Sequence, residues 1–300
     1  MMKYRKLGRT GLDVSVLGFG ALEIGRNWPY WRKEKYDFSR PTESDAIKVI
    51  QSAIDQGINF FDTAPAYFAS EEILGKAFNG IRKNILIATK CGEWFDGEKS
   101  IYDYSYSGTK KFIENSLRLL QTDYIDLLQI HSATADIIRT GDTLAAMKDL
   151  QKEGKVRFVG LSTDFEDAAL LAIESKEYDS IQVSYNAMNL LMRKNVFPLA
   201  EKNSIGIIIK DGMARGMLSP KYADVVDAQQ KEKIEQLIKI AAQNNITLSE
   251  LAVLYVISSP TVSSVIIGTK DIEHLHSNIL AIQRPLLSHD TLNAIAGLNF

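Results

Sequence analysis

The sequence predicts one domain of the α/β class, a (β/α)8 barrel of the TIM type that spans residues 1–300. Three observations support this prediction. Short runs rich in β-branched residues alternate with longer segments of helical period along the chain. Most of these runs are almost continuously apolar, which is typical of strands covered on both faces of a parallel sheet. A length of 300 residues is also within the usual size of a single α/β barrel.

The barrel strands are expected at eight apolar runs, which occupy residues 16–20, 58–61, 85–89, 124–130, 156–161, 180–183, 206–209 and 264–267. A helical pattern follows each run, the seventh only after a detour. These patterns cover residues 43–56, 70–78, 109–120, 143–153, 165–174, 195–203, 248–258 and 272–282. Eight strands that each lead into a helix are the repeat of this type of barrel.

The first helical segment, 43–56, shows why a helix is expected. Its apolar residues are spaced three and four apart and so share one face of a helix: Ala46, Val49, Ile50 and Ala53. Thr42 precedes the segment and Asp45 lies three residues later, a pattern that indicates an N-terminal cap. Gly57 is placed to end the helix.

Several segments fall outside the repeat. Residues 3–7 and 13–15 flank a turn at 8–11 and suggest a hairpin ahead of the first barrel strand. Extra helices are expected near the C-terminus, at 228–243 and, more weakly, at 287–298. Two long loops rich in aromatic residues, 28–36 and 93–106, follow the first and third strands.

Composition narrows the class of protein. A net charge of -2 gives no reason to expect nucleic acid or an anionic membrane as a partner. The single cysteine, Cys91, excludes an internal disulfide and fits a reducing compartment. The first residues lack the apolar core of a secretory signal, and the apolar stretches are too short to span a bilayer. The sequence therefore predicts a soluble cytoplasmic protein.

Polar residues stand where three consecutive strands are expected to end. Asp62 follows the second strand, Lys90 the third and His131 the fourth, while Tyr67 lies in the loop after Asp62. A barrel carries its chemistry at the C-terminal ends of its strands, and consecutive strands are neighbours. These four side chains are therefore expected to converge, although each alone could be a rim residue that bonds to a loop.

The four residue types suit the exchange of one proton. Burial disfavours a charged lysine, and a neighbouring carboxylate restores the charge, so Asp62 would keep Lys90 protonated. The ammonium would lower the pKa of Tyr67 from about 10, because a unit charge at about 4 Å supplies on the order of 4 kcal/mol at an effective dielectric of about 20. Asp62 would take back part of this effect. Neutral His131 would make a second polar contact to the oxygen that receives the proton.

A metal site is not expected. The chain has only four histidines, and His274 and His276 are too close together in sequence and lie far from His131. No obvious carboxylate pattern accompanies them.

These residues resemble, in order and spacing, the aldo-keto reductase superfamily. The matching stretches are "GFGAL", "FFDTAPAY", "IATKCG", "LLQIHS", "VRFVGLS", "IQVSYN" and "SVIIGTKDIEHLHSNI", which together cover nearly the whole chain. The resemblance implies a (β/α)8 barrel that binds NADP(H) and transfers a hydride reversibly between nicotinamide and a carbonyl or alcohol. It assigns Tyr67 as general acid/base, Lys90 and Asp62 as its tuning pair, and His131 as the residue that orients the carbonyl.

The resemblance also implies cofactor contacts. Ser162 and Gln182 match positions that bind the nicotinamide carboxamide, and Lys210 replaces an aromatic residue that stacks on the ring in many relatives. At the other end of the cofactor, the start of the helix after strand eight would bind phosphate through free backbone N–H groups. The residues expected there are Gly268, Thr269, Lys270, His274 and Asn278.

The preference for NADP(H) or NAD(H) depends on the residues at the start of the helix after strand eight. Lys270 matches a basic residue that binds the adenosine 2′-phosphate, whereas His274 stands where many NADPH-specific members carry arginine. NADP(H) is therefore favoured, and NAD(H) is also possible. Asn278 matches the adenine contact of the family.

The substrate is expected to be a small carbonyl compound or a sugar. Aromatic residues of the two long loops could line its site, and Trp28 and Trp94 are the candidates chosen here. The opening of the chain and the Lys210 loop are similar to those of microbial members that act on sugars.

Two other functions stay open. Lys90 could form a Schiff base, as in a lyase, although Asp62 favours the charged lysine that cannot attack a carbonyl. Some family members instead serve as nicotinamide-sensing subunits of channels, and an intact set of four residues does not exclude that role.

Overall fold

The structure, a computed structural model, describes residues 1–27, 39–224 and 227–298. Eight parallel strands close into a barrel in the order β10-β11-β12-β3-β4-β5-β8-β9. Their bounds are Leu17–Gly20 (β3), Phe60–Asp62 (β4), Leu86–Cys91 (β5), Ile125–Ile130 (β8), Val156–Thr163 (β9), Ser180–Ser184 (β10), Gly206–Lys210 (β11) and Val262–Gly268 (β12). The predicted (β/α)8 barrel is confirmed.

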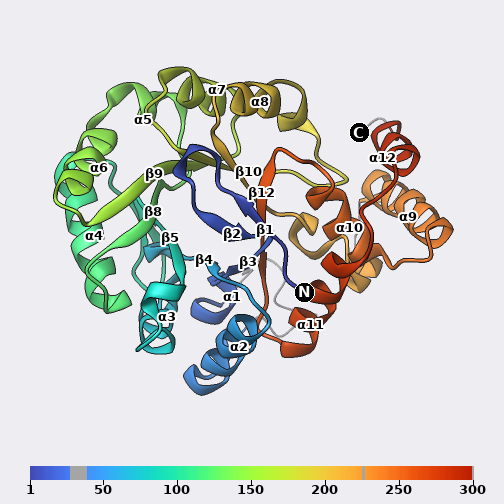
Figure 1. Ribbon diagram of the computed structural model, residues 1–300, viewed down its shortest axis with the longest axis horizontal. Helices are drawn as coiled ribbons and strands as arrows, with labels where there is room; N and C mark the ends of the chain where they lie inside the picture. The colour runs from blue at the N-terminus through green and yellow to red at the C-terminus, as the bar shows by residue number, and fades with distance from the viewer. Residues whose placement is uncertain (28–38, 225–226, 299–300) are drawn as a thin grey trace.

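Helices form an outer ring around these strands (Figure 1). The ring contains α2 Glu43–Asp55, α3 Ser70–Ala77, α4 Tyr106–Leu120, α6 Asp142–Lys152, α7 Glu166–Ser175, α8 Leu191–Lys202, α10 Leu248–Ile257 and α11 Ile272–Gln283. Thr42 caps α2 as expected, because its hydroxyl accepts a hydrogen bond from the Asp45 N–H. The extra helices near the C-terminus are α9 Ala228–Gln243 and α12 His289–Ala296, which pack together at one side.

The expected N-terminal hairpin consists of β1 Tyr4–Lys6 and β2 Asp13–Ser15, and it lies across the centre of the strand ring in Figure 1. Its apolar residues Leu7, Leu12 and Val14 join Phe60 and Leu127 in one buried cluster. Phe60 and Leu127 lie in the N-terminal halves of β4 and β8. The hairpin therefore closes the N-terminal end of the barrel. The opposite end is left for the site.

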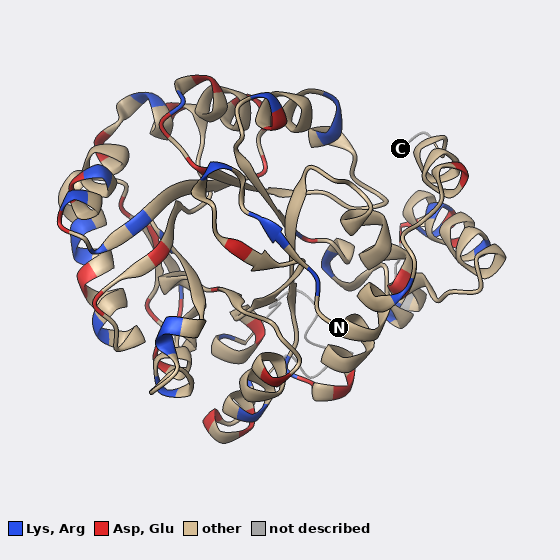
Figure 2. Cartoon of the chain, viewed as in Figure 1, with Lys and Arg blue, Asp and Glu red and all other residues tan. Residues whose placement is uncertain are grey.

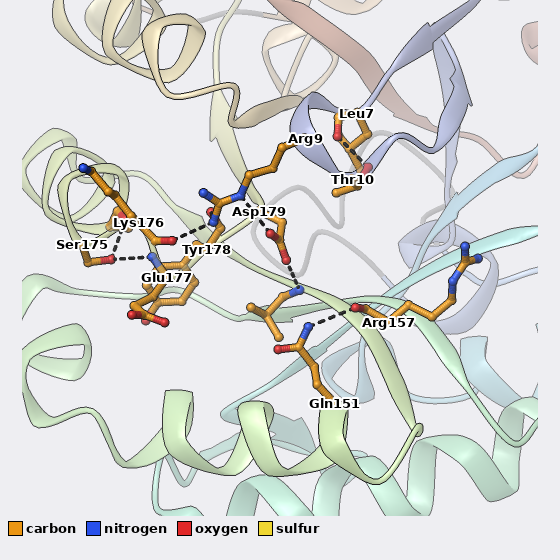
Figure 3. Close-up of polar contacts among 12 residues, drawn as sticks. Leu7, Arg9, Thr10, Gln151, Arg157, Ser175, Lys176, Glu177, Tyr178 and Asp179 are labelled. Carbon is orange, nitrogen blue, oxygen red and sulfur yellow. Dashed lines mark hydrogen bonds and ion pairs between the residues drawn. The ribbon is translucent and has the colours of Figure 1, made fainter.

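Two arginines fasten this hairpin to the barrel. Arg9 pairs with Asp179 at 3.0 Å and donates to the carbonyls of Lys176 and Tyr178 (Figure 3). Arg5 donates to three carbonyl groups at the end of α10 and the start of β12, those of Ile257, Ser259 and Val262. Each contact satisfies backbone oxygens that a strand or helix end leaves unpaired.

The barrel interior changes from apolar to polar along its axis. Phe60, Leu127 and Ile208 lie in the cluster beneath the hairpin. Two residues further on, the same faces of β4 and β8 carry Asp62 and Gln129, since side chains on a strand alternate with a period of two. The polar half of the interior is therefore the C-terminal half.

Several strands run further than predicted. β4 includes Asp62 and β5 includes Lys90, whereas the apolar runs predicted ends at residues 61 and 89. The pairing continues because these polar side chains find partners inside the barrel, which an apolar pattern cannot indicate. Three elements were not predicted: α1 Leu22–Gly25, α5 Ala135–Thr140 and the hairpin formed by β6 Glu93–Phe95 and β7 Ser100–Tyr102.

Acidic and basic residues are interspersed over the outer helices in the view of Figure 2. No single helix within residues 1–27, 39–224 and 227–298 is long and apolar enough to cross a membrane. Only the bent pair Ala228–Gln243 and Leu248–Ile257, at 86° to each other, passes a test of length and composition.

A buried acid links α3 to the barrel. Glu71 is 1% exposed, and its Oε1 accepts a hydrogen bond of 2.6 Å from the Thr89 hydroxyl of β5. Its Oε2 has no hydrogen-bond partner within the described part of the chain. Burial raises the pKa of Glu71 from 4.5 to about 7, so the folded protein holds a proton that the unfolded chain releases at lower pH.

We therefore predict that Glu71→Gln changes how stability depends on pH. In the original chain the free energy of unfolding should fall as pH rises from about 4.5 to about 7, by up to about 3 kcal/mol, because the folded state binds the extra proton. Glutamine keeps an acceptor for Thr89 and has no proton to lose, so this contribution should vanish. Urea unfolding at pH 5 and pH 8 measures it, with the exposed Glu72→Gln as control. The same pH dependence in both variants would contradict the prediction.

Candidate active site

An ion pair lies at the centre of the mouth of the barrel. Lys90 Nζ is 2.6 Å from Asp62 Oδ1, and the side chains are 1% and 4% exposed. The same ammonium donates to the Thr63 carbonyl oxygen at 2.9 Å and to the Tyr67 hydroxyl oxygen at 3.2 Å. Each of the three N–H groups of Lys90 thus has one oxygen acceptor. A buried ammonium group needs such acceptors because it has lost its contacts with water.

The second oxygen of Asp62 is held by two glutamines. Gln182 Nε2 donates to Asp62 Oδ2 at 2.9 Å and Gln129 Nε2 donates to it at 3.2 Å. Asp62 therefore accepts hydrogen bonds at both oxygens. Gln129 was not among the predicted site residues. The available signal was its place two residues before His131, on the same inward face of β8.

Tyr67 ends a short turn that follows β4. The turn, η3 Pro65–Tyr67, begins with a proline whose fixed φ suits its first position. The next residue, Phe68, has a φ of 57° and a ψ of −100°, a conformation that costs a residue with a side chain of order 1–3 kcal/mol. The Tyr67 hydroxyl oxygen accepts a hydrogen bond from Lys90 Nζ at 3.2 Å.

The structure corrects the expected acidity of Tyr67. The pKa of Tyr67 is raised well above its ordinary value, first by burial and then by the negative charges of Asp62, Glu93 and Asp211, while Arg26 lowers it. The ring keeps some exposed surface, but its hydroxyl group is densely surrounded. Lys90 is close enough to stabilise a phenolate, yet Asp62 offsets its charge. Tyr67 is therefore a neutral phenol in this structure.

His131 follows β8 and faces Tyr67. Their ring centroids are 5.9 Å apart at an angle of 83°, and the His131 N–H of the main chain donates to the Cys91 carbonyl at 2.9 Å. Burial lowers the pKa of His131 well below its ordinary value, and the cations Lys90, Lys210 and Arg26 act in the same direction. The imidazole is therefore neutral at neutral pH, as expected.

One further acid reaches this histidine. Glu93 Oε2 is 3.0 Å from His131 Nδ1, although Nδ1 has no hydrogen bond of good geometry with any described residue. The distance places the pair within reach of strong electrostatic interaction, but the ring N–H does not point straight at the oxygen. Glu93 was not predicted to belong to the site.

The two residues expected to contact nicotinamide lie on neighbouring strands. Ser162 of β9 and Gln182 of β10 are register partners, and the Ser162 hydroxyl is buried with no hydrogen-bond partner among the described residues. Gln182 is 2% exposed and already donates to Asp62. An unpaired buried hydroxyl beside a fixed amide fits a site for the polar carboxamide of a ligand.

A floor without side chains lies on β3 and β12, which β11 separates from β10 in the barrel. Gly20 of β3 pairs with Gly268 of β12, and a Cβ built on Gly20 would lie 3.0 Å from the Ile266 Cγ2 and 3.2 Å from the Gly268 N atom. Side chains are thus excluded from this part of the mouth, which allows a flat group to approach the backbone closely. The residues present fit a nicotinamide dinucleotide.

Lys210 is also near the mouth, at the end of β11. Its Nζ is 3.1 Å from Asp164 Oδ1, and a quarter of its side chain is exposed. The next residue, Asp211, has a φ of 56° and accepts a hydrogen bond of 2.7 Å from the Ser184 hydroxyl. The pair of Lys210 and Asp164 joins the ends of β9 and β11.

The helix expected to bind phosphate is capped by an acid. The side chain of Asp271 accepts hydrogen bonds from the backbone N–H groups of Glu273 and His274, at the start of α11. These donors are therefore not free for phosphate, contrary to the expectation. The sequence pattern showed a helix start but not that its own N-cap residue would occupy the donors.

The other residues of this group lie around the same end of β12. Gly268 is exposed and Thr269 is buried, while Asn278 on α11 is half-buried. Lys270 Nζ donates to the Ser39 carbonyl oxygen at 2.7 Å. His274 is exposed.

Glu23 is an acid that the sequence reading missed. It lies on α1, and its side chain is within 4 Å of where a Cβ on Gly268 would be. Burial raises the pKa of Glu23, while Lys221, Lys270 and His274 lower it. Positive groups therefore surround one carboxyl group beside the expected phosphate site.

Of the two expected substrate residues, Trp28 lies outside the described residues. Trp94 is 44% exposed on β6. Beside it, the Phe95 ring packs edge-on against Phe68 at 6.0 Å, and the Arg26 guanidinium lies 3.5 Å from the centre of the Phe95 ring. Aromatic and cationic groups thus form one wall of the mouth.

Within the described ranges, no group of three or more histidine, cysteine, aspartate or glutamate side chains is arranged to hold a metal ion.

Comparison with known proteins gives independent evidence on the family of this chain. A model of the Aldo/keto reductase family matches residues 16–299. L-galactose dehydrogenase of Arabidopsis thaliana is 28% identical in an alignment of length 296 that covers 94% of this chain and 88% of that protein. The NADH-specific methylglyoxal reductase of Escherichia coli is 27% identical in an alignment of length 320 that covers 96% of each chain.

A solved structure shows the same architecture. The holo form of aldo-keto reductase AKR11C1 from Bacillus halodurans superposes with a TM-score of 0.86 at 27% identity, over 99% of this chain and 96% of that one.

The buried ion pair leads to a stability prediction. Asp62→Asn and Lys90→Met should each lower the free energy of unfolding by about 3–5 kcal/mol, because each leaves an uncompensated buried charge. The double variant should lose clearly less than the sum of the two single losses. Urea unfolding of the four proteins completes the cycle. Additive losses would show that the two charges do not depend on each other.

Proposed function

Because this chain belongs to the aldo/keto reductase family, we propose that it transfers a hydride between a nicotinamide cofactor and a carbonyl or alcohol substrate. One observation carries the proposal. Lys90 Nζ lies 3.2 Å from the Tyr67 hydroxyl oxygen and 2.6 Å from Asp62 Oδ1, so a phenol, an ammonium and a carboxylate form one connected set at the open end of the barrel. The relatives described above are named as reductases and dehydrogenases.

Tyr67 acts as the acid of the reaction. Its raised pKa keeps the phenol protonated at neutral pH, so it is ready to give a proton to the oxygen of a carbonyl as that oxygen gains negative charge. Lys90 then stabilises the phenolate that remains, since its ammonium already donates to the same oxygen. Asp62 holds Lys90 in the charged form that this step needs. His131 orients the substrate oxygen.

The proposed contacts to the nicotinamide and to the 2′-phosphate lie in different parts of the mouth. Ser162 and Gln182 would hold the carboxamide next to the glycine floor, and Lys210 would flank the ring; the bound nicotinamide supplies or accepts the hydride, which no side chain can do. We favour NADP(H), with Lys270 at the 2′-phosphate. NAD(H) is the alternative, because Glu23 and Asp271 place negative charge nearby and one relative is named NADH-specific.

The proposed substrates are aldehydes, ketones or sugars. The names of two relatives specify L-galactose and methylglyoxal, a sugar and a small dicarbonyl compound. The aromatic wall near Trp94 and Phe95 could bury an apolar substrate or pack on the C–H face of a sugar.

A Schiff-base mechanism is disfavoured by the contacts of Lys90. Its Nζ lies within hydrogen-bond distance of Asp62, Thr63 and Tyr67 together, and the carboxylate at 2.6 Å favours the ammonium form. A nucleophilic lysine must instead be neutral.

The first test is Tyr67→Phe. This variant should bind the cofactor as before and reduce carbonyl compounds at least about 10²-fold more slowly, as expected for the loss of a positioned proton donor. Absorbance of the reduced nicotinamide, followed over a panel of aldehydes, ketones and sugars in both directions, measures the rate. Tyr106→Phe is the control, because Tyr106 is exposed and bonds to Asp149 on the outer helices.

Turnover near the original rate in Tyr67→Phe would remove this residue from its assigned role. Cofactor binding without turnover across the whole panel by the original chain would favour a nicotinamide-sensing protein instead.

The cofactor preference is tested with Lys270→Ala. If Lys270 binds the 2′-phosphate, the variant should weaken NADPH binding by about 10-fold or more and leave NADH binding nearly unchanged, as for the loss of one charged hydrogen bond. Titration of both cofactors by fluorescence measures the two dissociation constants. Equal losses would show that the phosphate lies elsewhere.

A further inference from the structure

Glu93 occupies an unusual position for an acid. The chain leaves β5 at Cys91 and turns at Gly92, whose φ is 94°, before it enters β6. Glu93 is 8% exposed, whereas the next residue, Trp94, is 44% exposed. The alternation of side chains along β6 therefore directs the Glu93 carboxyl group inward, towards the mouth of the barrel.

The backbone around Glu93 is held firmly. A Cβ built on Gly92 would lie 2.2 Å from the Tyr104 ring, so only glycine permits this close packing. The Tyr104 hydroxyl donates to the His131 carbonyl oxygen at 2.9 Å. The hairpin that carries Glu93 and the backbone that carries His131 are thus tied to one another through Tyr104.

The carboxyl group meets one particular nitrogen of His131. Glu93 Oε2 is 3.0 Å from Nδ1. Nδ1 is fully buried and has no hydrogen bond of good geometry with any described residue, so the contact is an electrostatic one. The other nitrogen, Nε2, points away from Nδ1 across the ring and is left to contact a ligand. A proton on Nδ1 is favoured beside a carboxylate, and in the neutral ring this leaves the lone pair on Nε2.

Three cations near the His131 ring affect its charge in the opposite direction from Glu93. Lys90 on β5, Lys210 on β11 and Arg26 after α1 all disfavour a positive imidazolium, and the Tyr67 ring packs edge-on against His131. Glu93 is the carboxylate within ion-pair distance of this ring among the described residues. A carboxylate at 3.0 Å favours a positive imidazolium, the opposite direction from the three cations.

We propose that Glu93 is a positioning residue for His131, one that holds Nδ1 so that Nε2 meets the substrate oxygen, and that makes the imidazole easier to protonate. The proposal rests on the proposed function, in which His131 contacts the substrate. It adds a fifth side chain to the connected set of Asp62, Lys90, Tyr67 and His131. It also predicts that the neutral ring accepts a hydrogen bond from a substrate hydroxyl, whereas the protonated ring donates one to a carbonyl oxygen.

Two variants separate the two effects of Glu93. Glu93→Gln keeps an oxygen for Nδ1 but removes the charge, whereas Glu93→Leu removes both. The exposed acid of the same hairpin gives the matched control, Glu98→Gln. The whole chain is labelled with 15N, and the His131 ring signals are identified among the four histidines by their loss in His131→Asn.

The NMR spectra should show the proton of the neutral His131 ring on Nδ1 in the original chain and in Glu93→Gln. In Glu93→Leu the preference should be lost. The pH at which His131 takes up its second proton should be lower in Glu93→Gln than in the original chain or in Glu98→Gln, because a negative charge has been removed. A proton on Nε2 in the original chain, or an unchanged titration in Glu93→Gln, would overturn the proposal.

Kinetics supply a second readout. Glu93→Leu should lower kcat by about tenfold or more, the range found for outer partners of other functional histidines, with little change in cofactor KM. An unchanged kcat would also overturn the proposal. Because the NMR measurements need no turnover, they still judge the role of Glu93 if the original chain fails to reduce any substrate, a result that would count against the proposed function alone.

Discussion

The ion pair of Asp62 and Lys90 is the interaction on which the site depends. Moving two charges from water into the middle of a barrel costs several kcal/mol for each ion, and their attraction repays this only when the other donors and acceptors are satisfied. Here Gln129 and Gln182 complete the contacts of Asp62, while Thr63 and Tyr67 complete those of Lys90. The polar half of the barrel interior can be understood as the surroundings that this pair requires, and the apolar hairpin closes the other half.

The same surroundings set the protonation states of Tyr67 and His131, the two groups proposed to face the substrate. Burial and nearby carboxylates raise the pKa of Tyr67, whereas burial and nearby cations lower the pKa of His131. Both groups are therefore neutral near pH 7. The Tyr67 phenol can donate a proton, whereas the neutral His131 ring, with the proton that we propose on Nδ1, can accept a hydrogen bond at Nε2. Opposite shifts of two neighbouring groups are a common way to divide acid and acceptor roles in one site.

The adenosine end of the expected cofactor site differs in character from the nicotinamide end. Around β3, β9 and β10 the mouth offers backbone, a hydroxyl and an amide that can meet a neutral ring. Around α11, acids and bases are mixed, since Asp271 occupies the helix start and Glu23 lies near Lys270. If a dinucleotide binds here as proposed, its 2′-phosphate would meet a mixture of charges from α1, α11 and the loop after β12.

Periodicity was enough to predict the barrel, because apolar runs and helical stripes depend only on residues that are near in sequence. It also brought Asp62, Lys90 and His131 together, since parallel strands of one barrel end at the same edge. The sequence analysis did not predict the roles of Gln129 and Glu93, the acidic cap on α11 or the raised pKa of Tyr67. The cap on α11 is a local contact, which an aspartate at the helix start indicates. The roles of Gln129 and Glu93 and the raised pKa of Tyr67 depend instead on burial or on a distance of about 3 Å between atoms from different elements. Only the closed barrel brings such atoms together. Their positions in it determine which neighbouring charge has the larger effect on the pKa of a side chain.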